Sequence, residues 1–143
     1  MRLLLLTCSA CFVMVDVMAA TITINCPAKF PAEQITFSGT PAGWTPYTRS
    51  ALEVTTADLM HGPPSSYEYA VPSKYRDEKR RVVATWGVTP GPGMKKWLQC
   101  GYGAAAELSL SQPLPESTSE CTVIKHKDAQ GNVTKVEAIC QLE

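Results

Sequence analysis

Four cysteines are the residues of this sequence whose type and spacing point most directly to chemistry. They remain when residues 1–20 are set aside, and they are Cys26, Cys100, Cys121 and Cys140. An even number of cysteines in a small exported domain is typical of disulfide bonds. A zinc site of four thiolates is disfavoured, because no two of them have the close C-x(2–4)-C spacing of such sites. We therefore predict two disulfide bonds and no metal site.

These four cysteines can form two disulfide bonds in three ways, and the sequence alone does not choose among them. Cys121 and Cys140 lie on one face of a predicted hairpin, so a bond between them, with Cys26 bonded to Cys100, is geometrically allowed. We favour the alternative, Cys100–Cys121 with Cys26–Cys140, because it gives each cysteine a partner on a nearby strand. Either way, each bond closes a loop of about 20 residues or more and contributes about 3 kcal/mol or more in the chain-entropy account.

Motifs for catalysis or cofactor binding are missing from the sequence. There is no G-x-S-x-G elbow and no P-loop, dinucleotide fingerprint or H-E-x-x-H. The two histidines, His61 and His126, would need partners from distant segments to form a zinc site or a triad. We therefore predict no catalytic residue, no cofactor and a protein that is not an enzyme. The mixed charge run from Ser73 to Arg81 is expected to be a solvated loop.

Aromatic residues in segments rich in proline and glycine are the remaining signal. Aromatics on loops held by a rigid sheet commonly build binding surfaces, and proline-stiffened loops lose little entropy on docking. The alternative is that these rings cap the ends of the core. The candidate binding residues are Trp44, Tyr47, Gly62, Pro63, Pro64 and Tyr67.

Short strands separated by turn residues must position these groups. Alternating or β-branched runs predict strands at 21–26, 34–38, 52–60, 82–86, 95–102, 107–111, 121–126 and 133–140. Residues 65–70 favour one helical turn, and the segment 89–93 is expected to join two antiparallel strands. The pattern predicts a single all-β domain with at most one short helix, folded as a disulfide-bridged antiparallel sandwich or small barrel.

Residues 1–20 have the order of a secretory signal peptide. A positive start is followed by an apolar run and by small residues that allow cleavage after Ala19 or Ala20. The run is shorter than the roughly 20 residues of a membrane span and is interrupted by Asp16, which disfavours a retained anchor. Lipid attachment at Cys8 or Cys11 is disfavoured, because much of the apolar run lies beyond them. We predict a signal peptide at 1–20, one domain at 21–143, a periplasmic or secreted location and no stable membrane insertion.

Composition narrows the class of partner. The chain has 143 residues, 45% of them apolar, which suits one globular domain. Thirteen Lys/Arg balance thirteen Asp/Glu, so no long-range field attracts nucleic acid. We predict a non-enzymatic exported binding protein that recognises another protein, as an inhibitor or immunity factor for a cell-wall-acting enzyme or toxin. The alternatives are a small-molecule carrier with an apolar barrel interior and an enzyme with an unrecognised site.

Several short motifs occur in a familiar order along the chain. They are Cys26-Pro27, Gly43-Trp44, Gly62-Pro63-Pro64, Val71-Pro72, the run Trp97–Tyr102, Leu108, Leu114-Pro115 and Cys121-Thr122-Val123. Their order resembles a family of small exported bacterial hypothetical proteins of the STY type. The resemblance implies a bacterial periplasmic or secreted domain with disulfides and carries no catalytic residues. The chain is also loosely similar to small periplasmic lysozyme inhibitors in size, bridges and β content.

Overall fold

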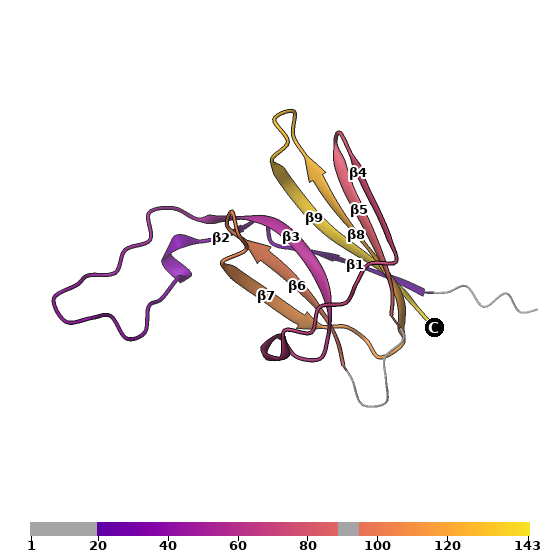
Figure 1. The fold of residues 1–143 in the computed structure, drawn as a ribbon, viewed down its shortest axis with the longest axis horizontal. Coiled ribbons are helices and arrows are strands. Elements are labelled where there is room, and N and C mark those ends of the chain that lie inside the picture. Colours follow the sequence, from indigo (N-terminus) through magenta and orange to yellow (C-terminus); the bar gives the residue numbers. More distant parts are fainter. Residues whose placement is uncertain (1–19, 89–94) are drawn as a thin grey trace, which may run out of the picture.

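The computed structural model describes residues 20–88 and 95–143, and these fold into two antiparallel β-sheets (Figure 1). The predicted signal peptide therefore lies outside the described residues, except for Ala20. The predicted connection at 89–93 lies outside them as well.

The first sheet has five strands in the order β1-β9-β8-β5-β4. These strands are β1 (Ala20–Asn25), β4 (Lys74–Glu78), β5 (Arg81–Gly87), β8 (Thr118–Lys127) and β9 (Val133–Leu142). The β8–β9 hairpin turns where the sequence predicts a turn. There the Asp128 carboxylate accepts hydrogen bonds from the backbone amides of Gln130 at 2.9 Å and Asn132 at 2.8 Å. Aspartate favours turns for this reason.

The second sheet has four strands in the order β2-β3-β6-β7. These strands are β2 (Lys29–Phe30), β3 (Leu52–His61), β6 (Lys96–Tyr102) and β7 (Leu108–Pro113). Two short 3-10 helices flank β3, namely η1 (Ala32–Gln34) before it and η2 (Pro64–Ser66) after it. As predicted, residues of β6 alternate, so that Leu98 and Cys100 are buried while Trp97 and Gln99 face outward.

The core lies between the two sheets. It is formed by the inward-facing, mostly apolar positions of both sheets, and β3 packs across β9. The largest fully buried side chains include Val54, Leu59, Leu98, Tyr102, Val123 and Val136. Burial on one face of each sheet is the packing of a β-sandwich. The predicted fold class is therefore confirmed.

The two disulfide bonds join Cys26 to Cys100 and Cys121 to Cys140. The pairing that we favoured from the sequence is wrong, because it assumed that Cys100 and Cys121 lie on neighbouring strands. Their strands β6 and β8 belong to different sheets. Cys121 instead lies directly opposite Cys140 in the β8–β9 ladder, with the Cα atoms 4.1 Å apart. Cys26 follows β1 and donates its amide to Val136, so its bond to Cys100 ties the two sheets together.

The mixed charge run at 73–81 was predicted to be a solvated loop, and this prediction is wrong. It is no loop, because Lys74–Glu78 forms β4 and pairs with β5 through a tight hairpin in which Glu78 lies opposite Arg81. β4 is the last strand of its sheet, and all its residues are exposed. An edge strand open to solvent on both faces accommodates charged side chains throughout, so the run lacks the apolar alternation that identifies other strands.

Two further local predictions are wrong. Residues 34–38 form no strand, and the chain there runs from η1 into an irregular segment that extends away from the sheets (Figure 1). Strands β5 and β6, expected to be antiparallel neighbours, lie in different sheets. Residues 34–38 have the pattern of a strand but no neighbouring edge with which to form hydrogen bonds. Residues 82–86 and 95–102 do form strands, but β5 pairs with β4 and β8 whereas β6 pairs with β3 and β7.

Candidate protein-binding site

Residues 31–51 form a long excursion between β2 and β3, here called the arm. Figure 1 shows it projecting from the body of the sandwich. Gly39 and Gly43 take positive φ angles of 75° and 82°, which glycine adopts at little cost and which allow the arm to turn back on itself. The amide of Trp44 donates to the carbonyl of Pro41 at 3.1 Å, so this turn is closed within the arm.

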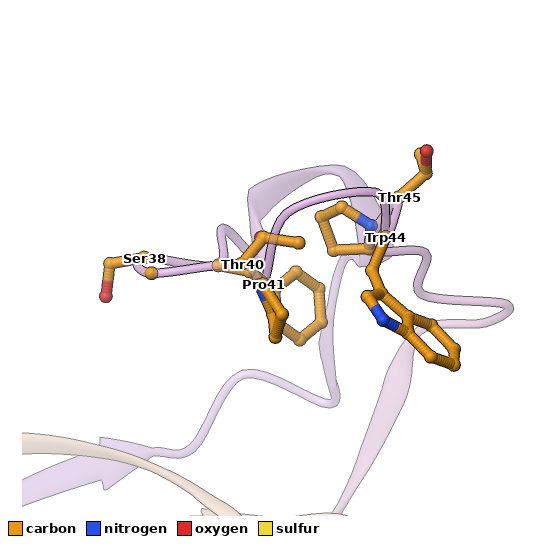
Figure 2. Close-up of a pocket in the computed structure, with 8 residues that line it drawn as sticks. Ser38, Thr40, Pro41, Trp44 and Thr45 are labelled. Atoms are coloured by element: carbon orange, nitrogen blue, oxygen red, sulfur yellow. The ribbon is translucent and has the colours of Figure 1, made fainter.

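Three aromatic side chains of the arm face solvent. Phe37 is 54% exposed, Trp44 77% and Tyr47 81%. In Figure 2 the Trp44 ring and Pro41 project from the same side of the backbone. Phe37, Pro41, Trp44 and Pro46 contribute to a pocket of about 350 Å³, and the arm alone lines it. Exposed apolar surface of this kind marks interaction sites in soluble proteins.

The arm is also almost free of charge. Its charged residues are Glu33 near its start and Arg49 near its end, and residues 34–48 between them carry none. A second hollow, of about 710 Å³, lies on the adjoining part of the arm and includes Tyr47 and both charged residues in its lining. The arm therefore presents aromatic and uncharged polar groups, with one charge of each sign at its base.

The second group of predicted binding residues forms the turn after β3. Gly62 is buried and takes a φ of 94°, Pro63 is exposed, and Pro64 begins η2. The Ser66 hydroxyl donates to the carbonyl of Pro63 at 2.8 Å and closes the turn. Tyr67 then adopts the left-handed conformation with a φ of 54°, and its side chain is 77% exposed.

The structure does not bring the two groups of predicted binding residues together. Trp44 and Tyr47 precede the first residue of β3, whereas the turn from Gly62 to Tyr67 follows its last residue. A strand of ten residues at about 3.3 Å per residue is roughly 30 Å long. The two groups therefore lie toward opposite ends of β3 and form two separate surfaces.

Some exposed apolar residues were not singled out by the sequence analysis as binding candidates. Phe37 was assigned to a strand that does not form, so its exposure was missed. Tyr69 and Val71 lie on the segment that leads from the turn to β4, Tyr75 lies within β4, and all three are exposed. Tyr69 bridges to Met60 at the open edge of β3. Tyr69 and Tyr75 carry the same signal as Tyr67, because they too are aromatic residues in or beside an irregular segment of the sequence.

Groups able to do acid–base or metal chemistry are scattered over the molecule. Across 20–88 and 95–143, no set of three His, Cys, Asp or Glu side chains is placed to hold a metal ion. His126 and Lys135 contact the Glu137 carboxylate at 2.8 and 2.6 Å, and the hydrogen bonds from Lys135 and then His126 lower the pKa of Glu137. These three side chains lie on the outward face of the first sheet, with His126 and Lys135 well exposed.

Lys96 is a buried cation of the second sheet. The Lys96 side chain is buried, and its ammonium donates to the backbone carbonyls of Glu116, at 3.0 Å, and Thr118. Burial lowers the pKa of Lys96. Because its partners are carbonyl groups of the chain itself, Lys96 anchors the segment before β8.

Comparison with known protein families places most of the chain in a family. The family of type VI secretion system Tli immunity proteins matches residues 48–141, which is well over half of the chain and runs from the end of the arm to β9. No curated protein and no solved structure matches the chain. The STY-type family is not confirmed, whereas the looser likeness to exported inhibitors agrees with an immunity protein. The chain therefore belongs to the type VI secretion system Tli immunity protein family.

Proposed function

We propose that this protein is a non-enzymatic immunity protein that neutralises one effector toxin of a type VI secretion system by binding to it. The observation that carries the proposal is the family match over residues 48–141. The fold is compatible with this role, because a sandwich tied by two disulfides holds its loops rigidly for contact with a partner.

The disulfides also support the proposal that the chain works outside the cytoplasm, in the periplasm or after secretion. Disulfides form and persist in oxidising compartments, and residues 1–20 have the pattern of an export signal. Within the described residues, no helix is both long and apolar enough to cross a membrane.

The scattered titratable groups support a role in binding rather than catalysis. An acid–base site needs titratable side chains that face one substrate position. The Glu137 cluster lies on an open sheet face, and Lys96 contacts carbonyl groups of its own chain. The carrier alternative is not favoured either, because the two pockets described above lie on the arm and the space between the sheets is filled by the core.

The arm is the docking surface that the structure favours. Trp44 and Tyr47 are large, exposed and held on a segment that contains three prolines, so they can bury much apolar area at a small entropic cost. The turn Gly62-Pro63-Pro64 with Tyr67 is the second docking surface. Most of the arm precedes the matched residues 48–141, so it is the part of the chain best suited to select one toxin.

The toxin class is expected to be an enzyme that attacks the cell wall, because such enzymes act in the compartment to which the export signal directs the chain. Survival of a sensitive bacterium tests this directly. The type VI effectors of the bacterium that encodes this chain are directed, one at a time, to the periplasm of the sensitive bacterium, with or without this chain. Cell-wall hydrolases are tested first and other envelope toxins next. We expect rescue from one effector and a stable complex with it. A chain lacking residues 1–20 is the control and should not protect.

Two double variants test the docking surfaces once that effector is known. Trp44→Ala with Tyr47→Ala should weaken binding about 30-fold or more, because large aromatic residues dominate interface energetics. Pro64→Ala with Tyr67→Ala tests the turn, and Leu110→Ala, an exposed apolar residue of β7 outside the proposed surfaces, is the matched control. If no effector is neutralised by the natural chain, the proposed function is wrong. If one is neutralised and neither double variant weakens the complex, only the assignment of the surfaces is wrong.

A further inference from the structure

We infer that the hairpin end of the five-stranded sheet is a third recognition surface, separate from the arm and the turn, which attracts and contacts an acidic patch on the toxin. This inference rests on the proposed function. The surface consists of residues 74–81, from β4 to the start of β5, and residues 125–137, from the end of β8 into β9. It is called the basic end below.

The neutral composition of the chain conceals a separation of charge. The basic end carries eight Lys/Arg and four Asp/Glu, a net charge of +4. The rest of residues 20–143 carries four Lys/Arg and eight Asp/Glu, a net charge of −4. Two thirds of the cations of the folded domain are thus gathered in the two short segments of the basic end.

The two segments of the basic end lie side by side in the structure. β5 pairs with β8 so that Arg81 is opposite His126, and the amide of Lys127 donates to the carbonyl of Arg80 at 2.8 Å. The two hairpins rise together from one end of the sheet in Figure 1. Cations of both hairpins therefore act on the same region of solvent.

Some of these cations are neutralised locally and others are not. Glu78 pairs with Arg81 at 2.7 Å, and Asp77 and Glu137 pair with lysines of the β8–β9 hairpin. Lys74, Arg76, Lys79 and Arg80 are exposed and form no ion pair with any described carboxylate. These four side chains, together with Lys125, which also forms no ion pair with a described carboxylate, supply the uncompensated positive potential.

Apolar side chains adjoin the basic end on the outward face of the sheet. Val83 lies opposite Ile124 across β5 and β8, and Thr122 lies opposite Ile139 across β8 and β9. Ile139 is 37% exposed. A group of half-buried β-branched residues bordered by charged residues has the layout of a protein–protein interface, in which a drier centre is bordered by polar groups.

An acidic protein surface fits this charge distribution better than an extended polyanion. The positive potential is confined to one end of a domain whose remainder is negative. A membrane plane or a nucleic acid extends beyond the basic end and would also be repelled by the remainder. A localised acidic patch on a protein meets only the attractive part, and such pairs of patches speed association and select partners.

The test uses the full chain and the effector that it neutralises. Lys79→Glu with Arg80→Glu reverses two turn cations that lie outside the core and outside ion pairs. We expect the association rate constant at low salt to fall about 10- to 100-fold, with a small change in the dissociation rate constant. The natural complex should also associate more slowly as salt rises, and the variant should lose most of this dependence. Unchanged thermal unfolding of the variant confirms that it is folded.

The matched comparison is between two single variants that change net charge equally. Arg80→Glu lies in the basic end, and Lys95→Glu lies outside it at an exposed position before β6. Arg80→Glu should slow association several-fold more than Lys95→Glu. Equal effects of the two, or an unchanged rate in the double variant, would overturn the inference while leaving neutralisation, and so the proposed function, intact.

A second arm of the experiment decides the class of partner. The natural chain is added to phosphatidylglycerol vesicles and to duplex DNA at the same salt concentrations. Weak or absent binding is expected, because the negative remainder of the domain opposes both. Binding to either that matches the effector in affinity and is lost in Arg80→Glu would overturn the choice of a protein partner. A natural chain that neutralises no effector would overturn the proposed function, and this inference with it.

Discussion

Cys26 and Cys100 form a disulfide between the end of β1 and the middle of β6, with their Cα atoms 5.8 Å apart. This bond joins the five-stranded sheet to the four-stranded sheet and closes the stretch of chain that contains the arm. The Cys121–Cys140 bond, by contrast, joins neighbouring strands of one sheet.

The two disulfides should differ in their contribution to stability. The Cys26–Cys100 bond spans 74 residues and the Cys121–Cys140 bond spans 19. On the chain-entropy account, replacing both cysteines by alanine costs about 4 kcal/mol for the longer loop and about 3 kcal/mol for the shorter one. Urea unfolding of the two double variants under oxidising conditions measures the difference. A larger loss from removal of Cys121–Cys140 would contradict this order.

Gly101 in β6 should not tolerate a side chain. A Cβ atom there would lie 2.7 Å from a methyl group of Thr56 and 2.8 Å from the Cβ of Ala106. Gly101→Ala is therefore expected to destabilise the fold by about 1–3 kcal/mol through overpacking. Gly87→Ala is the control, since a Cβ there meets nothing within 4 Å and should change the free energy of unfolding by less than about 0.5 kcal/mol. Equal effects at both positions would exclude this contact as the cause.

Tyr102 buries a hydroxyl that has no hydrogen-bond partner in the described part of the chain. Tyr102→Phe keeps the ring and removes this cost, so we expect the free energy of unfolding to rise by about 1 kcal/mol at neutral pH. Tyr47→Phe, at an exposed position, should change nothing. A clear loss of stability in Tyr102→Phe would show that the hydroxyl is satisfied.

The same tyrosine gives a prediction for alkaline pH. Burial raises the pKa of Tyr102 in the folded protein, so the unfolded chain loses this proton first as pH rises. The natural protein should therefore lose stability as pH rises above about 10, the pKa of an unfolded tyrosine, toward the higher folded value. Tyr102→Phe should lack this part of the loss. Parallel curves of unfolding free energy against pH would refute the assignment.

Glu137 should make a small contribution to stability that is lost in acid. Its pKa is lowered by the hydrogen bonds from Lys135 and His126, so its stabilising effect is present above the unfolded pKa of about 4.3 and disappears as pH falls through the lower folded value. Glu137→Gln should cost about 0.5–1 kcal/mol at pH 7, because its partners are well exposed. The difference from the natural protein should vanish in strong acid. Glu120→Gln serves as the control, as this carboxylate has no ion pair within the described residues.

Local pattern was enough to predict most of the strands. The alternation of residues 107–111 corresponds to β7. The runs at 121–126 and 133–140 correspond to β8 and β9, each of which alternates because one of its faces is buried. The charged strand β4 could not be found in this way, since both of its faces meet solvent. The strand expected at 34–38 had a suitable pattern and no sheet edge to join.

The candidate site was predicted only in part. Residue type and breaker content identified Trp44, Tyr47 and the turn at Gly62-Pro63-Pro64 as loop positions, and their conformations agree. Their separation toward opposite ends of β3 was not predictable, because distance depends on how the strand runs through the fold. The basic end was not predicted for the same reason. Its two segments are distant in sequence and meet only through the pairing of β5 with β8.

The sequence by itself determined the class of fold, the presence of two disulfides and the expectation of a binding role, because these depend on residue types and on local periodicity. Only the tertiary structure decided which cysteines pair, which aromatic residues share a surface and where the charges gather. Those properties depend on which strands become neighbours and in which sheet. Strand order is set by long-range packing of the core, and no short stretch of sequence encodes it.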